Sequence, residues 1–215
     1  MRFLFRILLW SIPVGLIAVV MTYTGPDVTP EDFEGPDHYY SAVTRALLGE
    51  AAKRQPDGGE VVLIHFKMQN PAIAKQAKRD IKQVFKDSPS FTLAEDIELD
   101  ITDQAEEGGG LIRFDGGTFT QILADHPEAP IFISLVGEPT LSASEKQTLR
   151  DRDPVFVILS EGGTSSWPEA KKLMKEGLID AIVVRHLKPD NWDGTWDEEE
   201  RMWFDRRYDI LSNGE

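Results

Sequence analysis

The sequence predicts an α/β protein with one doubly wound, mostly parallel sheet of about five strands, preceded by one N-terminal transmembrane helix. Apolar runs such as "APIFISLVG" and "PVFVILSEG" do not alternate with polar residues, which is typical of strands buried on both faces. Segments with the period of helices separate these runs, as in a parallel sheet covered by helices. A longer apolar stretch at residues 3–23 predicts the membrane helix.

The apolar stretch is long enough to cross a bilayer, and Arg6 is its only charge. A spanning helix needs roughly 20 mostly apolar residues, whereas a cleaved signal has about 7–15, followed by small residues. Bulky residues stand at the would-be cleavage positions. An uncleaved signal-anchor at residues 1–23 is therefore favoured over a cleaved signal or a helix buried in a soluble protein, with residues 3–23 in the lipid bilayer.

Charge predicts the orientation of this anchor. Two arginines precede the span, and five acidic residues lie between it and the next basic residue, Arg45. Because basic residues near a span stay in the cytoplasm, the domain is expected on the outer side. In a bacterium this means a single-pass protein of the inner membrane with a periplasmic domain. The chain has no cysteine, so the presence or absence of disulfide bonds cannot indicate whether its compartment is oxidising.

Composition limits the partners. The chain has 23 basic and 37 acidic residues and a net charge of −14. An acidic excess argues against nucleic acid and against anionic lipid surfaces, since both require basic patches. Neutral, basic or metallic partners remain, and solubility alone explains the charge equally well.

The first segments after the anchor are a spacer and a helix. Residues 24–37 are rich in proline, glycine and acids, which predicts a solvated linker. The following segment "HYYSAVTRALLGEAAKRQ" has an apolar stripe at helical spacing and ends before "PDGGE". The α/β domain is expected to occupy residues 38–187.

Strands and helices then alternate along the domain. "EVVLIHFK" predicts the first strand, and "NPAIAKQAKRDIKQVFKD" predicts a helix capped by Asn70 with Pro71 in its first turn. "FTLAEDIELD" is a weaker strand whose pairing stays open, and "TFTQILADH" predicts a short helix. Further strands are expected at 129–137, 154–162 and 180–187, with a helix at "SSWPEAKKLMKEG". The series is flavodoxin-like or Rossmann-like.

The last segment, 188–215, is an acidic extension rich in aromatic residues. We consider two interpretations of its aromatic side chains: they cover an edge of the sheet or dock on the first helix, or they form a partner-binding surface. "RRYDILS" is a candidate edge strand. The acids near Gly194 lack EF-hand spacing; an irregular calcium site stays open, but no metal site is predicted. The candidate partner-binding residues are Trp192, Trp196, Trp203, Phe204 and Tyr208.

The loops after the strands are the places where such a fold keeps a ligand. "GEPTLS" follows the third strand, and the loop after the fourth is a candidate anion site that precedes a helix. Ser166 and Glu169 also have the spacing of a capping box, which explains this second loop without a ligand. The candidate loop residues are Gly162, Gly163, Thr164, Ser165 and Ser166.

No catalytic constellation is recognisable. No serine lies in a Gly-x-Ser-x-Gly turn, and no two histidines stand at metal-ligand spacing. The carboxylates lack a distinctive apolar setting. We therefore expect no cofactor and a protein that is not an enzyme; acid/base catalysis is unsupported rather than excluded, and an enzyme of no particular reaction class stays a third option.

One family resemblance carries further expectations. "PEAKKLMKEGLIDAIVVRHLKPD", with "APIFISLVGEP" before it, resembles a lobe of the type I periplasmic binding proteins. The resemblance spans residues 60–187 and implies small-ligand capture between two hinged lobes without catalysis. This chain departs from that pattern because it has residues for only one lobe.

Two functions are therefore predicted. The main hypothesis is a non-catalytic, membrane-anchored extracytoplasmic accessory subunit that docks on a larger membrane complex through its α/β domain and aromatic tail. The alternative is a small-ligand (solute) binding module related to one lobe of a periplasmic binding protein, with "GEPTLS" and "SEGGTSS" at the rim of its crevice.

Overall fold

The computed structural model describes residues 39–100, 114–160, 167–185, 204 and 208–212. By its contacts the chain divides into residues 1–37 and a compact unit from His38 to Glu215. Among the described residues no helix is long and apolar enough to cross a membrane. The predicted signal-anchor at 1–23 and the linker at 24–37 lie outside the described residues, so both stay predictions.

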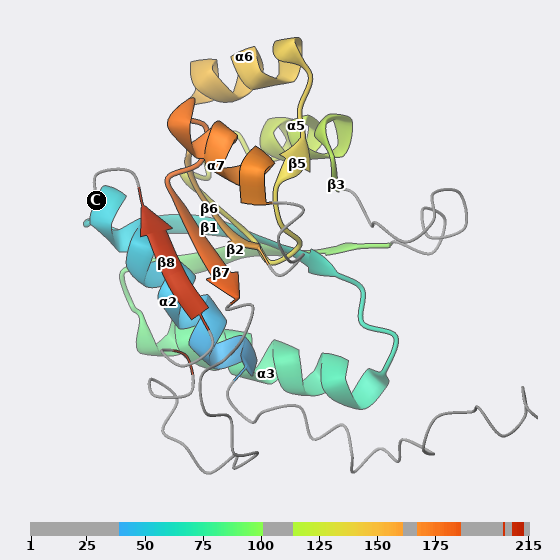
Figure 1. Ribbon diagram of the computed structural model, residues 1–215. Helices are drawn as coiled ribbons and strands as arrows, with labels where there is room; N and C mark the ends of the chain where they lie inside the picture. The colour runs from blue at the N-terminus through green and yellow to red at the C-terminus, as the bar shows by residue number, and fades with distance from the viewer. Residues whose placement is uncertain (1–38, 101–113, 161–166, 186–203, 205–207, 213–215) are drawn as a thin grey trace, which may run out of the picture. The chain divides into compact units, whose positions relative to one another are not determined.

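The compact unit is an α/β structure in which strands and helices alternate (Figure 1). Its helices are α2 (Tyr39–Arg54), α3 (Pro71–Asp87), α5 (Gly116–Asp125), α6 (Ala143–Arg152) and α7 (Trp167–Lys175). Its strands are β1 (Gly59–Phe66), β2 (Phe91–Leu99), β3 (Phe114–Asp115), β4 (Ile131–Ser134), β5 (Pro139–Thr140), β6 (Val155–Ser160), β7 (Ala181–Arg185) and β8 (Tyr208–Ser212).

Six strands form one sheet in the order β2-β1-β4-β6-β7-β8. The first five are parallel, and β8 pairs with β7 in the antiparallel sense. The parallel part has the strand order of flavodoxin-like folds. The predicted mostly parallel α/β sheet is thus confirmed, but it has six strands rather than five because the candidate edge strand in "RRYDILS" does pair. The short strands β3 and β5 form a separate parallel pair.

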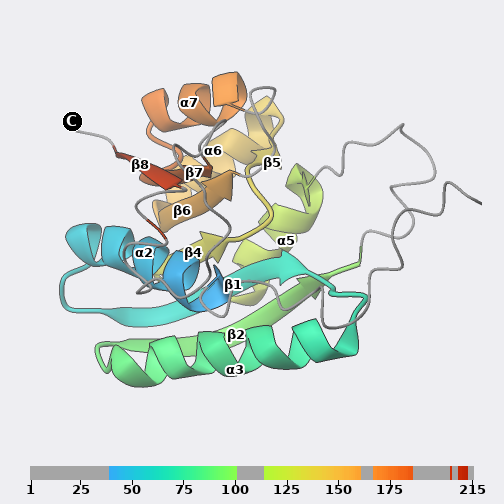
Figure 2. The same ribbon diagram turned by 60° about the horizontal axis from the view of Figure 1, so that its bottom comes forward.

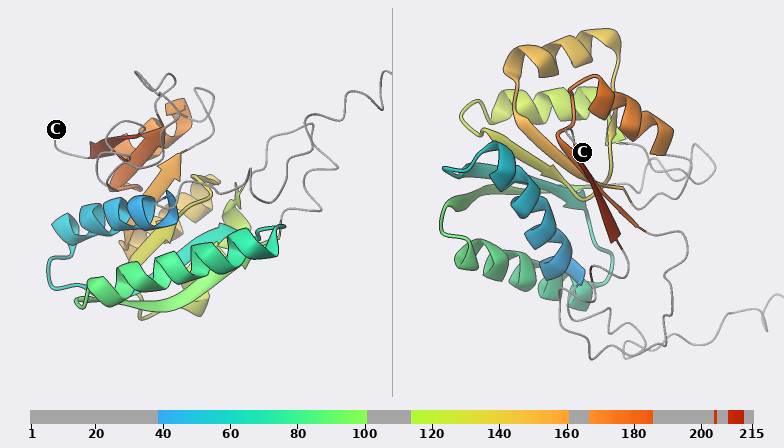
Figure 3. Two further views of the ribbon diagram at one scale, coloured as in Figure 1. Left: turned by 90° about the horizontal axis from the view of Figure 1, so that it is seen from below. Right: turned by 60° about the vertical axis from the view of Figure 1, so that its left-hand side comes forward.

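Helices cover both faces of the sheet. Helices α2 and α3 lie on one face and α5, α6 and α7 on the other (Figures 1 and 3). Figure 2 shows α3 running along β2, while α2 contacts β4, β6 and β7 in the middle of the sheet. The central strands are therefore shielded from water on both sides, which explains their continuous apolar sequences.

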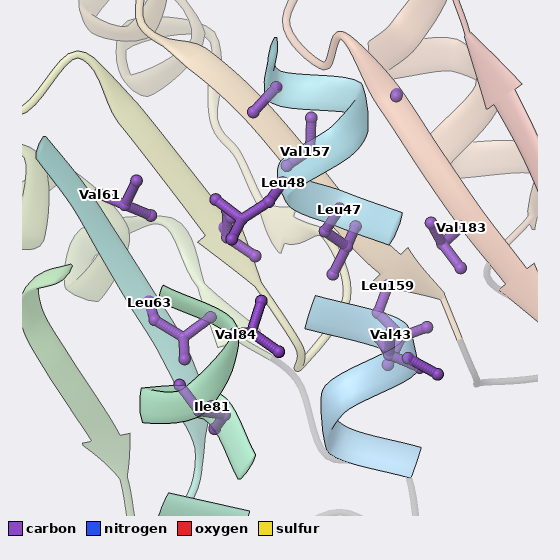
Figure 4. Packing of buried hydrophobic residues seen from close by; sticks show 14 of the residues in the cluster. Val43, Leu47, Leu48, Val61, Leu63, Ile81, Val84, Val157, Leu159 and Val183 are labelled. Carbon is purple, nitrogen blue, oxygen red and sulfur yellow. The ribbon is translucent and has the colours of Figure 1, made fainter. Parts of the chain in front are cut away.

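Each face has its own hydrophobic core. In Figure 4, leucine and valine side chains of α2 meet those of β6, β1 and α3. The opposite core contains Phe119, which stacks on Phe156 with 4.7 Å between ring centroids. Neighbouring residues of a strand point to opposite faces, so Val61 and Leu63 enter the first core while Val62 and Ile64 enter the second.

Strand β2 forms one edge of the sheet and contains a bulge. Val61 of β1 pairs with Leu93, but the next residue, Val62, pairs with Glu95, so Ala94 is an extra residue. The bulge reverses which face the following side chains occupy. Phe91 and Leu93 pack against the core under α2 and α3, whereas Ile97 and Leu99 pack against the opposite core. This strand, predicted only weakly, therefore contributes to both cores.

Local signals set the helix starts. The Asn70 side chain accepts hydrogen bonds from the N–H groups of Ala72 (2.9 Å) and Ile73 (3.4 Å), and Pro71 opens α3, as predicted. A capping box is present at the start of α6, between Ser142 and Glu145. The capping box predicted at Ser166 lies outside the described residues.

Candidate functional site

The strand order locates one candidate site. After β1 the chain turns outward to β2, and it later crosses to β4 on the other side of β1. Loops that follow these two neighbouring strands lead in opposite directions, and parallel α/β folds keep their ligands at such a switch point, outside the carboxyl ends of the strands. We call the residues after these strands, Lys67–Asn70 and Leu135–Glu138, the switch-point loops.

The first switch-point loop is largely occupied by its own contacts. Asn70 caps α3 through its side-chain oxygen, so amides at this helix start already have an acceptor. The Lys67 ammonium lies 3.0 Å from the Asp100 carboxylate. Both of these side chains are about half exposed, 55% and 51%, so water and salt weaken the pair and Lys67 stays accessible to a ligand.

The second switch-point loop is held in a tight turn by Ser134. This serine is fully buried, and its hydroxyl donates to the Gly137 carbonyl at 2.7 Å. The same hydroxyl accepts from the Val136 N–H at 3.3 Å. Gly137 has φ of +89°, a conformation that side chains disfavour. The turn positions the next residue, Glu138, at the carboxyl edge of the sheet.

Glu138 is the most distinctive ionisable group of the site. Burial raises the pKa of its carboxyl, its own backbone N–H lowers it, and the negative charge of Glu169 in the first turn of α7 raises it further, for a net increase. A partly desolvated carboxyl of this kind can accept hydrogen bonds from hydroxyl or ammonium groups, and when protonated it can also donate one.

A rigid support lies next to the second loop. Asp115 caps α5 by accepting the Thr118 N–H at 2.8 Å, and hydrogen bonds to Thr118 lower the pKa of Asp115. Gly116 lies so close to β5 that a Cβ there would be 2.7 Å from the Thr140 carbonyl oxygen. The pair β3–β5 thus joins the starts of α5 and α6 and fixes where the second loop leads.

A pocket of about 180 Å³ lies at the opposite, amino-terminal edge of the sheet. Its charged groups pair with each other: Glu50 with Lys53 at 2.7 Å and Asp180 with Arg54 at 3.4 Å. Opposite charges thus compensate within the pocket, and nothing in it selects one class of ligand. Its lining residues are Glu50, Lys53, Arg54, Asp180, Ala181 and Ser212.

The structure describes two of the five predicted partner-binding residues, Phe204 and Tyr208. Phe204 and Tyr208 are buried, with 7% and 4% of their surface exposed, and their rings stack 5.2 Å apart in the core under α2. Their surroundings match the interpretation that the tail covers the sheet, because buried rings present no surface to a partner. Trp192, Trp196 and Trp203 lie outside the described residues, and so do all five candidate anion-loop residues, Gly162, Gly163, Thr164, Ser165 and Ser166.

The sequence placed "GEPTLS" at the rim of the predicted ligand crevice, but it did not reveal the buried contact between His65 and Asp96. This contact joins β1 to β2 and could be found only from the strand register, because "FTLAEDIELD" shows no regular alternation. Among the described residues no group of three or more histidine, aspartate or glutamate side chains is placed to hold a metal ion.

Comparisons with known proteins found partial matches among solved structures. No protein-family model and no curated protein matches the sequence. Similar solved structures include a solute binding protein of an ABC transporter from Burkholderia graminis in complex with D-arabinose (18% identity, 70% of this chain, 47% of that chain, TM-score 0.45). Others are an arabinose binding protein from Geobacillus stearothermophilus (15%, 67% and 45%, TM-score 0.44) and a periplasmic sugar-binding protein from Pseudomonas fluorescens (14%, 68% and 43%, TM-score 0.46).

This chain spans less than half of the length of these structures. The resemblance to a single lobe of periplasmic binding proteins that the sequence predicted is thus also found among solved structures, at partial coverage.

Proposed function

We propose that the α/β domain is a non-catalytic, extracytoplasmic module that binds a small solute at the switch-point loops. The observation that carries this proposal is the strand order, which separates the loops after β1 and β4. Each of these loops supplies a charged group: the first has the half-exposed Lys67 ammonium and the second has the partly buried Glu138 carboxyl. Such a mixture of charged groups suits a polar solute.

Calorimetric titration of the full chain in detergent micelles tests this proposal. D-arabinose, L-lysine and L-glutamate serve as neutral, cationic and anionic probes. We expect one class to bind with one site per chain, and Glu138→Ala to weaken that binding at least tenfold. Glu60→Ala is the matched control, because Glu60 is exposed at the amino end of β1. Binding that both variants leave unchanged would place the site elsewhere, and no binding by any probe class would count against a solute module.

The accessory-subunit hypothesis is a second proposal that rests on the anchor predicted at residues 3–23 and on Trp192, Trp196 and Trp203. Residues 3–23 would also tether a solute-binding module, so the two proposals share a localisation. Purification through a C-terminal tag from native membranes in mild detergent separates them. Recovery in a complex of fixed stoichiometry that Trp203→Ala disrupts would support docking, and recovery as a lone monomer or homodimer would exclude it.

A further inference from the structure

The edge strand β2 is joined to the rest of the domain by acidic side chains that pair with basic residues of other elements. Two of these basic partners are histidines. Asp96 faces His65 of β1, and Glu95 faces His126 at the end of α5. As neighbours in a strand, these two acids point to opposite faces of the sheet, and the bulge at Ala94 decides which face each one occupies. An imidazole therefore contacts β2 from each side.

His65 is buried, with 3% of its surface exposed, and has acceptors at both ring nitrogens. Its Nδ1 lies 2.8 Å from the Phe66 carbonyl oxygen, and its Nε2 lies 2.8 Å from Asp96 Oδ1. The geometry of this second approach is that of a charge contact, because neither Nε2 nor Oδ1 has a hydrogen-bond partner in the described part of the chain. A neutral imidazole carries one N–H, so only the charged ring can donate toward both acceptors.

The charged groups around His65 favour its protonated form. Burial on its own lowers the pKa of His65, but the contacts with Asp96 and the Phe66 carbonyl, together with the charges of Asp96 and Glu98, outweigh burial and raise it above 6.5. The group that faces this cluster from α3 is Lys78, whose ammonium lies 2.6 Å from Glu98. The carboxylates of Asp96 and Glu98 therefore both raise the pKa of His65, and Glu98 is also paired with Lys78.

The second histidine contact is less buried. His126 Nε2 lies 3.2 Å from Glu95 Oε2, with 18% of the histidine side chain and 56% of the glutamate side chain exposed. His126 also ends α5, because its backbone N–H donates to the Ile122 carbonyl. This contact can hold β2 from the α5 side, and its exposure makes it the weaker of the two.

We propose that His65 is a proton-dependent clamp, which holds the edge strand β2 on the sheet through Asp96 when its imidazole is charged and loosens it when the imidazole loses its proton. The contact of His126 with Glu95 supports the same strand from the α5 side. The direction follows from linkage. The contribution of His65 is fully present below pH 6.5 and is lost as the pH rises through the higher pKa of the folded state. The pH range of the switch therefore starts near 6.5 and extends upward.

Hydrogen exchange of the full chain in detergent micelles, between about pH 5.5 and 8.5, brackets the ordinary pKa of histidine and tests the clamp. After correction for the intrinsic exchange rate, protection of residues 91–99 should fall as the pH rises, about tenfold for each unit by which the pKa of His65 in the closed state exceeds that in the open state. His65→Gln should abolish most of this pH dependence, whereas His126→Gln should lower protection through the loss of its contact with Glu95. Unchanged pH dependence in His65→Gln would overturn the proposal.

Lys78→Gln is the matched control. It removes another contact to β2 but leaves His65 and Asp96 in place, so protection should fall at every pH tested while its pH dependence persists. If His65→Gln does not fold, titration of the four imidazoles in the unmodified chain decides the matter. The clamp requires one imidazole to titrate above pH 6.5 and Asp96→Asn to lower its pKa; titration of all four at or below 6.5 would refute it.

Discussion

At the scale of single residues, Asn70 shows how one side chain fixes the start of an element. Its oxygen accepts two N–H groups at the start of α3, and loss of such a cap typically costs about 1 kcal/mol. We expect Asn70→Ala to lower the free energy of unfolding by about that amount in urea denaturation. Asn70→Asp keeps an acceptor at the cap and should cost little; equal losses in the two variants would show that the cap is not the cause.

Glu138 predicts a pH effect at the same scale. Because its folded-state pKa is raised, ionisation of Glu138 opposes folding, and this cost grows as the pH rises above 4.5. Glu138→Gln, which keeps the shape without the charge, should therefore raise the free energy of unfolding at pH 7. The gain should fade as the pH falls below 4.5, where the Glu138 carboxyl of the unmodified protein becomes protonated in the unfolded as well as the folded state. A variant that is less stable at pH 7 would contradict this reasoning.

At the scale of elements, the bulge in β2 decides which core the end of this strand contacts. Without Ala94, Ile97 and Leu99 would turn toward α3, and Asp96 would leave His65. We expect deletion of Ala94 to destabilise the protein and to remove protection from β2 in hydrogen exchange. Ala94→Ser retains the extra residue and should be nearly neutral. If the deletion and the substitution have similar stabilities, the bulge does not set the register.

At the scale of the whole domain, stability depends on two cores separated by one sheet. Phe119 is fully buried and contacts three other phenylalanine rings, with centroid distances of 4.7 Å to Phe156, 5.6 Å to Phe114 and 6.4 Å to Phe132. Phe119→Ala should cost about 3–5 kcal/mol, a large share of the 5–15 kcal/mol typical of a domain. Phe119→Leu leaves a smaller cavity, so in thermal unfolding it should lose clearly less stability than Phe119→Ala.

The sequence by itself determined the kinds and order of most elements. Periodicity and apolar runs are local properties, so they predicted α3 with its cap and the buried parallel strands β1, β4, β6 and β7, and they gave β8 as a candidate edge strand. It also located "GEPTLS", which contains Glu138, because loops after parallel strands gather at one edge.

Only the tertiary structure decided which side chains meet. The pairing of His65 with Asp96 requires the register of two strands and a bulge that local alternation does not reveal. Burial of Phe204 and Tyr208 beside α2 depends on residues far away in the chain, so their sequence fits a covering role and a binding role equally well. Contacts of this kind are set by register and packing, since they join residues that no short stretch of sequence contains together.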